Sequence, residues 1–143
     1  MIRTLRWLLV APMAVFGWSI AFSGTLALHS LIFMFCPPEQ QISGMCTAPW
    51  AATTEGILII LGAAFSGLLV VVSAVIAAPA YKTQVGLVIY GLGLGVAVWA
   101  YLETAALSAL IAAILGGLIA VWRITKKYGW RRASRFRQYE LFI

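Results

Sequence analysis

Long apolar runs separated by short polar segments are the main pattern along this chain of 143 residues. A helix that crosses ~30 Å of hydrocarbon needs roughly 20 apolar residues. The last apolar run, residues 85–122, is too long for one crossing, and we place a hairpin at Glu103, its only charged residue. The nearby Trp99 and Tyr101 are typical of the membrane interface. The pattern therefore predicts four spans, over residues 7–33, 55–78, 85–101 and 104–122.

Composition favours the same class of protein. Hydrophobic residues make up 63% of the chain and charged residues only 10%, whereas a soluble domain carries about 25% charged residues. The first apolar run begins like a secretory signal but continues to Phe35, which is too long for one, so we expect a retained helix. The expected fold is an all-α integral membrane protein, a single-domain four-helix transmembrane bundle with short loops.

The four predicted spans place all the basic residues on one side of the membrane. All ten Lys and Arg lie before residue 7, at Lys82, or after residue 122, and four crossings place these segments together. The opposite side holds the loop 35–54 and the Glu103 turn and has no Lys or Arg. Because positive residues stay inside, we expect both termini to be cytoplasmic. Small size favours a bacterial source, so we expect a multi-pass protein of the inner membrane with the loop 35–54 outside.

Both cysteines lie in the outer loop, and two interpretations compete for them. Cys36 and Cys46 would form a disulfide in an oxidising compartment. Alternatively, Met34, Met45 and His29 would join the cysteines as ligands of Cu(I), which prefers soft sulfur donors. The spacing matches no zinc or copper signature and contains no CxxC pair. We therefore favour the disulfide and expect no metal and no other cofactor.

Ionisable residues are scarce where chemistry would need them. The chain has no Asp, a single His, and no Lys or Arg within the predicted spans. Catalysis and ion-coupled transport need convergent ionisable groups, so we expect no enzyme. Glu55 and Glu103 are the possible functional acids. The simpler interpretations are that His29 is an interfacial residue bonded to a carbonyl or water and that Glu55 is a helix cap. Glu103 becomes a functional candidate if the hairpin lies elsewhere and draws it into the membrane.

Small residues recur four positions apart in the last three predicted spans. This spacing lets helix backbones approach closely in lipid, where no hydrophobic force drives helices together. Intramolecular packing is the simpler interpretation, and a contact between copies or with another protein is the alternative. The expected packing residues are Gly62, Ser66, Gly67, Gly91, Gly95, Gly116 and Gly117.

The predicted cytoplasmic tail, residues 123–143, interleaves basic and aromatic residues. Beyond Gly129, apolar positions at a spacing of three to four predict a short amphipathic helix at the membrane surface. Basic residues there attract anionic headgroups by about 1 kcal/mol each, and protein docking is the alternative to lipid binding. Nucleic acid is not an expected partner. The residues expected to contact lipid or a partner are Lys126, Lys127, Trp130, Arg131, Arg132, Arg135, Phe136, Arg137 and Tyr139.

Together these features favour a small non-catalytic integral membrane subunit that packs against a larger membrane complex and stabilises or assembles it. Its partners would be membrane lipids and other integral membrane proteins, or further copies of itself. One alternative is a small oligomeric transporter or lipid-carrier flippase. A second alternative is an outer-face copper or redox accessory factor.

Overall fold

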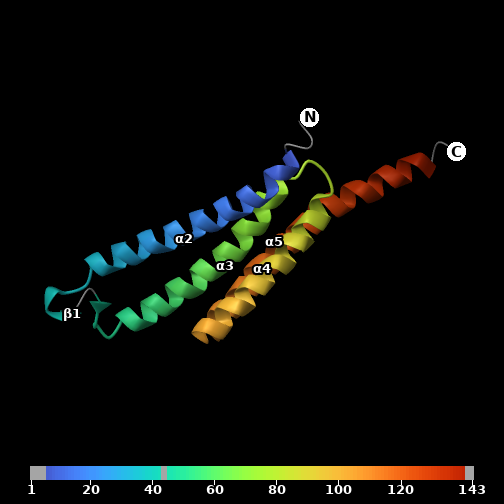
Figure 1. Cartoon of the computed structure of the whole chain (residues 1–143). Coiled ribbons are helices and arrows are strands. Elements are labelled where there is room, and N and C mark those ends of the chain that lie inside the picture. Colours follow the sequence, from blue (N-terminus) through green and yellow to red (C-terminus); the bar gives the residue numbers. More distant parts are fainter. Residues whose placement is uncertain (1–5, 43–44, 141–143) are drawn as a thin grey trace.

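The computed structural model describes residues 6–42 and 45–140, with only the backbone described for Met45 and residues 129–140. Within these ranges the chain forms four long helices, α2 (Val10–Met34), α3 (Ala51–Ala77), α4 (Lys82–Thr104) and α5 (Leu107–Glu140) (Figure 1). Each contains a segment long and apolar enough to cross a membrane. The expectation of an all-helical, multi-pass membrane protein is thus confirmed at this level, while the orientation in the membrane stays a prediction.

The helix boundaries differ from the predicted spans at the polar ends. α3 begins at Ala51, four residues before the predicted start, and α4 extends from Lys82 to Thr104. The turn to α5 is made by Ala105, which has a positive φ of 53°. The Thr104 hydroxyl donates to the Ala100 carbonyl at 2.8 Å and accepts the Ala106 N–H at 3.4 Å. The turn therefore forms without Gly or Pro, and the Thr104 hydroxyl bonds to backbone groups on both sides of it.

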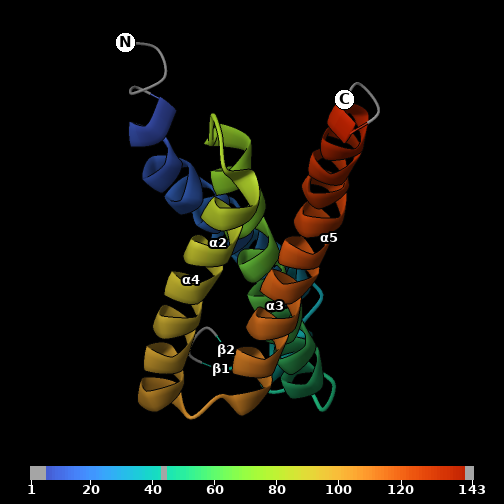
Figure 2. The same cartoon turned by 90° about the vertical axis from the view of Figure 1, so that its right-hand side faces the viewer.

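The helices pack in an unequal way. α3 lies against both α2 and α5 along much of their length, and α4 packs on α5 and α3. α2 and α4 touch chiefly where Val10 and Val85 meet Ala74 and Ala78. We call this end, with the α3–α4 connection, the terminal end, and the opposite end, with both the cysteine loop and the α4–α5 turn, the disulfide end. Figure 2 shows α4 standing away from the other helices toward the disulfide end.

The buried core is small and lies toward the terminal end. Its members include Val71 and Val75 of α3 and Val121 and Ile124 of α5. Large apolar side chains are instead exposed along all four helices, as at Phe16, which is 56% exposed. No polar or charged side chain is buried among the described residues. Such a surface suits a lipid environment, where exposed apolar side chains meet hydrocarbon rather than water.

The basic tail continues α5 instead of forming a separate helix. α5 runs through Gly129 to Glu140 without a break, as the orange-to-red ribbon of Figure 1 shows. Near the end of its apolar segment, the Lys82 and Lys127 ammonium groups lie 5.1 and 5.8 Å from the centre of the Tyr128 ring. Lys126 lies 5.3 Å from that of Trp122. The predicted tail side chains from Trp130 to Tyr139 lie outside the described side chains, as do residues 141–143.

Candidate functional site

The cysteine loop is a short hairpin closed by a disulfide. Cys36 and Cys46 lie at disulfide distance, with an S–S separation of 2.03 Å. The strands β1 (Gln41–Ile42) and β2 (Met45–Cys46) pair in antiparallel fashion after the 3₁₀ helix η1 (Pro38–Gln40). The Gln41 side-chain amide donates to the Cys36 carbonyl at 2.9 Å. This agrees with the disulfide that we favour from the sequence. Cysteines held in a disulfide supply no thiolate ligand for copper.

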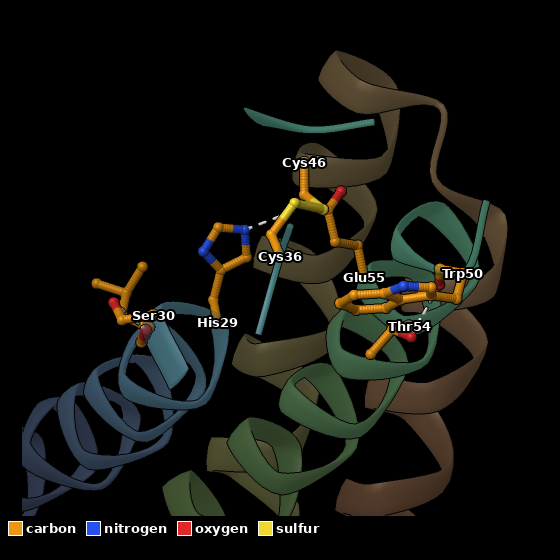
Figure 3. Close-up of polar contacts among 8 residues, drawn as sticks. His29, Ser30, Cys36, Cys46, Trp50, Thr54 and Glu55 are labelled. Carbon is orange, nitrogen blue, oxygen red and sulfur yellow. Dashed lines mark hydrogen bonds and ion pairs between the residues drawn. A yellow bond between two sulfur atoms is a disulfide. The ribbon is translucent and has the colours of Figure 1, made fainter. Parts of the chain in front are cut away.

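At the disulfide end, a side-chain contact joins α2 to α3. The Nε2 atom of His29 lies 3.5 Å from Oε1 of Glu55, and the two side chains are 49% and 43% exposed. Figure 3 shows the His29 side chain on α2 and the Glu55 side chain on α3, with a dashed line for the contact. Glu55 is not in the first turn of α3, so the expected capping role is wrong. The helix instead starts at Ala51, and the Trp50 carbonyl accepts the Thr54 hydroxyl at 2.9 Å.

The sequence analysis assigns separate roles to His29 and Glu55, although their distances from the connecting loop indicate that they lie side by side. The two helices are antiparallel neighbours joined by one loop, and residues equally far from that loop lie side by side. His29 lies five residues before the end of α2, and Glu55 lies four residues after the start of α3. Because the predicted second span starts at residue 55 instead of Ala51, the sequence analysis does not place Glu55 at the same distance from the loop as His29.

A cavity of about 560 Å³ lies between α2 and α4, with α3 and α5 behind it. The α4 wall includes Gly93 and Ala97, and the α2 wall includes Trp18. Many of the lining residues are Gly, Ala or Ser, whose short side chains leave the space open. None of the described residues that line it is Asp, Glu, Lys or Arg. We call this cavity the membrane cleft.

The small residues predicted to pack divide into two groups. A side chain at Gly67 would meet Ala113 of α5, and one at Gly116 would meet Ala64 of α3. Gly62 approaches Thr25 of α2, and Gly117 lies under the Tyr90 ring. These glycines therefore allow close contact within the molecule, as intramolecular packing predicts.

Gly91 and Gly95 behave differently. A Cβ built at either position meets nothing within 4 Å, and both residues are exposed. Because an α-helix turns by about 100° per residue, Gly91 and Gly95 lie on the side of α4 opposite Gly93. We call the exposed side that Gly91 and Gly95 form the glycine face. α4 thus presents Gly93 to the membrane cleft and the glycine face away from it.

Three polar side chains of the cleft already have partners. The Ser66 hydroxyl donates to the Ala63 carbonyl at 2.8 Å, and the Thr104 hydroxyl bonds within α4. The Tyr90 hydroxyl donates to the Ile114 carbonyl of α5 at 3.3 Å. Ser66 therefore lines the cleft instead of filling a close helix contact. The small-residue spacing of Gly93, Ala97 and Ala100 was the sequence signal for this space.

The remaining ionisable candidates do not converge on the cleft. Glu103 lies exposed in the last turn of α4, at the disulfide end. Among the described residues, no three His, Cys, Asp or Glu side chains are placed to hold a metal ion. Comparisons with protein-family models, curated proteins and solved structures found no match to this chain.

Proposed function

We propose that this chain is a small non-catalytic membrane subunit that binds a transmembrane helix of a larger membrane protein complex. The observation that carries the proposal is the glycine face of α4, where Gly91 and Gly95 are exposed with open space around them. A glycine in a helix costs roughly 0.5–1 kcal/mol relative to alanine. Small residues four apart allow close approach of a second helix, and here no helix of the chain itself makes that approach.

The orientation follows from charge and from the cysteines. Lys82, Arg123, Lys126 and Lys127 lie at the terminal end, and the disulfide lies at the other. The positive-inside rule favours a cytoplasmic terminal end, and an oxidising compartment favours an external disulfide. We infer a bacterial inner-membrane protein with both termini inside. The basic end of α5 then extends into the cytoplasm, where anionic headgroups and the partner are its expected contacts.

The distribution of ionisable groups supports a role without catalysis. The contact between His29 and Glu55 is half exposed and lies beside the loop, away from the cleft. An acid–base pair would need a substrate pocket between or beside its members. The ionisable groups therefore lie at the ends of the helices, and the apolar helix faces are the surfaces available to bind a partner helix.

Co-purification in mild detergent tests the proposed function. We expect the wild-type chain to bring down an integral membrane protein, and a Gly91→Leu, Gly95→Leu double variant to lose it. Gly93→Leu is the matched control, because it adds the same side chain to the opposite side of α4, also into open space. A wild-type homodimer with no partner, dissociated by the double variant, would show self-association and contradict the subunit function.

The membrane cleft favours a second candidate function, a small transporter or lipid-carrier flippase. An apolar space of about 560 Å³ at membrane depth is within the ~300–1,000 Å³ typical of ligand sites. Reconstituted vesicles with a fluorescent lipid in one leaflet would test this function. Faster exchange between leaflets with the wild-type chain than with Gly93→Leu supports it, and equal exchange rejects it.

A further inference from the structure

We propose that a groove between α3 and α5, near the terminal end, binds one phospholipid with a net negative headgroup. These two helices form its walls, and among the described residues none of α2 or α4 lines it. We call it the basic groove, and the lining residues that matter here are Leu68, Val72, Ile119, Arg123, Lys126 and Lys127. Because the glycine face lies on α4, the inference does not depend on the subunit function. It assigns a specific site to the anionic headgroups that we expect near the basic end of α5.

Three positive charges from α5 lie together at the terminal end of the basic groove. Lys126 and Lys127 follow Arg123 by three and four residues, so the three side chains are neighbours on the helix surface. All three are exposed, and among the described side chains no carboxylate forms an ion pair with any of them. Like charges at this spacing repel one another. A negative group between them would remove this repulsion and accept their hydrogen bonds.

Toward the disulfide end, the basic groove becomes apolar. Ile119 lies about 6 Å from Arg123 along the axis of α5, at ~1.5 Å per residue. On the opposite wall, Val72 and Leu68 continue the apolar surface one turn further along α3. The cations lie near the end of the segment Leu107–Tyr128, which is long and apolar enough to cross a membrane. The order from charged to apolar along the groove therefore matches the order of headgroup and acyl chain in a phospholipid of the same leaflet.

The charges favour an acidic phospholipid over the other occupants. A zwitterionic headgroup carries a cation of its own, which would join three cations that have no carboxylate partner among the described side chains. A partner helix would need an acidic side chain at this depth, where ionisable residues are rare because their burial is costly. An acidic phospholipid brings its phosphate to this level and lays its acyl chain on the apolar walls. Arg123 and the two lysines then donate hydrogen bonds to the phosphate oxygens.

Two arginine variants test the headgroup contact. The full-length wild type, Arg123→Gln and Arg6→Gln are reconstituted in nanodiscs of equal phosphatidylglycerol and phosphatidylcholine, extracted into mild detergent and examined by native mass spectrometry. We expect the wild type to retain one phosphatidylglycerol in preference to phosphatidylcholine. Arg123→Gln should lower this retention about fivefold or more, because one basic contact to the headgroup is lost. Arg6→Gln is the matched control, since it removes the same charge from the terminal end without touching the groove, and it should retain the lipid.

A second pair of variants tests the acyl-chain contact. Ile119→Trp fills the apolar part of the groove and should also lower retention. Ile111→Trp is its matched control, because Ile111 lies on the same helix, is equally exposed at 49% and is outside the groove. Retention of the Cys36–Cys46 disulfide and an unchanged helical signal by circular dichroism identify variants that fold.

Three outcomes would overturn the proposal. Equal losses with Arg123→Gln and Arg6→Gln would show attraction to the overall charge and no site. Equal retention of the two lipids by the wild type would show bulk lipid only. A co-purified protein in place of lipid, lost with Arg123→Gln, would show that the groove binds a partner. Loss of the helix partner in the proposed function is scored on the Gly91→Leu, Gly95→Leu variant, so the two proposals fail independently.

Discussion

At the scale of single residues, the contact between His29 and Glu55 joins α2 to α3 but contributes little to the stability of the protein. Their side chains are 49% and 43% exposed, and the Nε2 to Oε1 distance is 3.5 Å. Exposed ion pairs typically contribute about 0–1 kcal/mol to the free energy of unfolding. The contact thus helps to set the alignment of α2 with α3 more than it stabilises the protein. The Cys36–Cys46 disulfide constrains the connection between these two helices more strongly.

We expect loss of the Cys36–Cys46 disulfide to lower the free energy of unfolding by about 2–3 kcal/mol, because closing a loop with a sequence separation of 10 restricts the unfolded chain. Cys36→Ser, Cys46→Ser would be compared with wild type by thermal unfolding in detergent. Wild type with added reductant is the matched control, and its unfolding temperature should equal that of the double variant. A double variant as stable as wild type would contradict this expectation.

The sequence predicts the cysteine pairing and misses the histidine contact for a physical reason. The chain's two cysteines lie in one loop and have only each other as partners, so the redox state of the compartment determines whether they pair. The contact between His29 and Glu55 instead depends on where α3 begins. The helix starts at Ala51 with no side-chain cap on Trp50, so no N-cap signal marks that position.

At the scale of the helices, α4 differs from α3 and α5 in the middle of its length, although its Gly86 near the terminal end is buried against Val75 and Ile124. α3 and α5 meet through Gly67 and Gly116, whereas Gly91, Gly93 and Gly95 all have open space. The sequence shows small residues four apart in each of these helices. Which of those pairs makes a contact depends on tertiary packing, and periodicity within one helix carries no information about it.

The contrast between Gly116 and Gly91 gives a prediction about stability. A Cβ at Gly116 would meet the Ala64 backbone, which is unable to move aside as a side chain does. We expect Gly116→Ala to lower the free energy of unfolding by about 1–3 kcal/mol. Gly91→Ala, in open space on a helix, should raise it by about 0.5–1 kcal/mol. Thermal unfolding of both variants in one detergent measures the difference, and equal effects would contradict the packing of α3 on α5.

At the scale of the whole molecule, the core lies toward the terminal end, and the cleft reaches from Ala11 near that end to Thr104 at the disulfide end. Val71 belongs to both the core and the lining of the cleft. Figure 2 shows α4 standing away from the other helices toward the disulfide end. The apolar pattern predicts how many helices there are and about where each lies. It does not predict the cleft, because every face of a membrane helix is apolar and the pattern does not distinguish lipid-facing from cavity-facing positions.

The orientation of the molecule gives the last prediction, and it combines charge with redox chemistry. The disulfide lies at one end, and Lys126, an exposed residue, lies at the other. Positive segments resist transfer across the membrane. In intact cells we therefore expect a membrane-impermeant maleimide to label Cys36 and Cys46 only after addition of an impermeant phosphine reductant.

A Lys126→Cys variant, tested without reductant, is the control for the opposite side. Its new thiol should stay unlabelled in intact cells and react after the membrane is permeabilised. Because the native cysteines are held in the disulfide, the new thiol is the one group that reports. Labelling of Lys126→Cys in intact cells would reverse the orientation. It would also place the basic end of α5 outside, where it would no longer be available to a cytoplasmic partner or to anionic lipid of the inner leaflet.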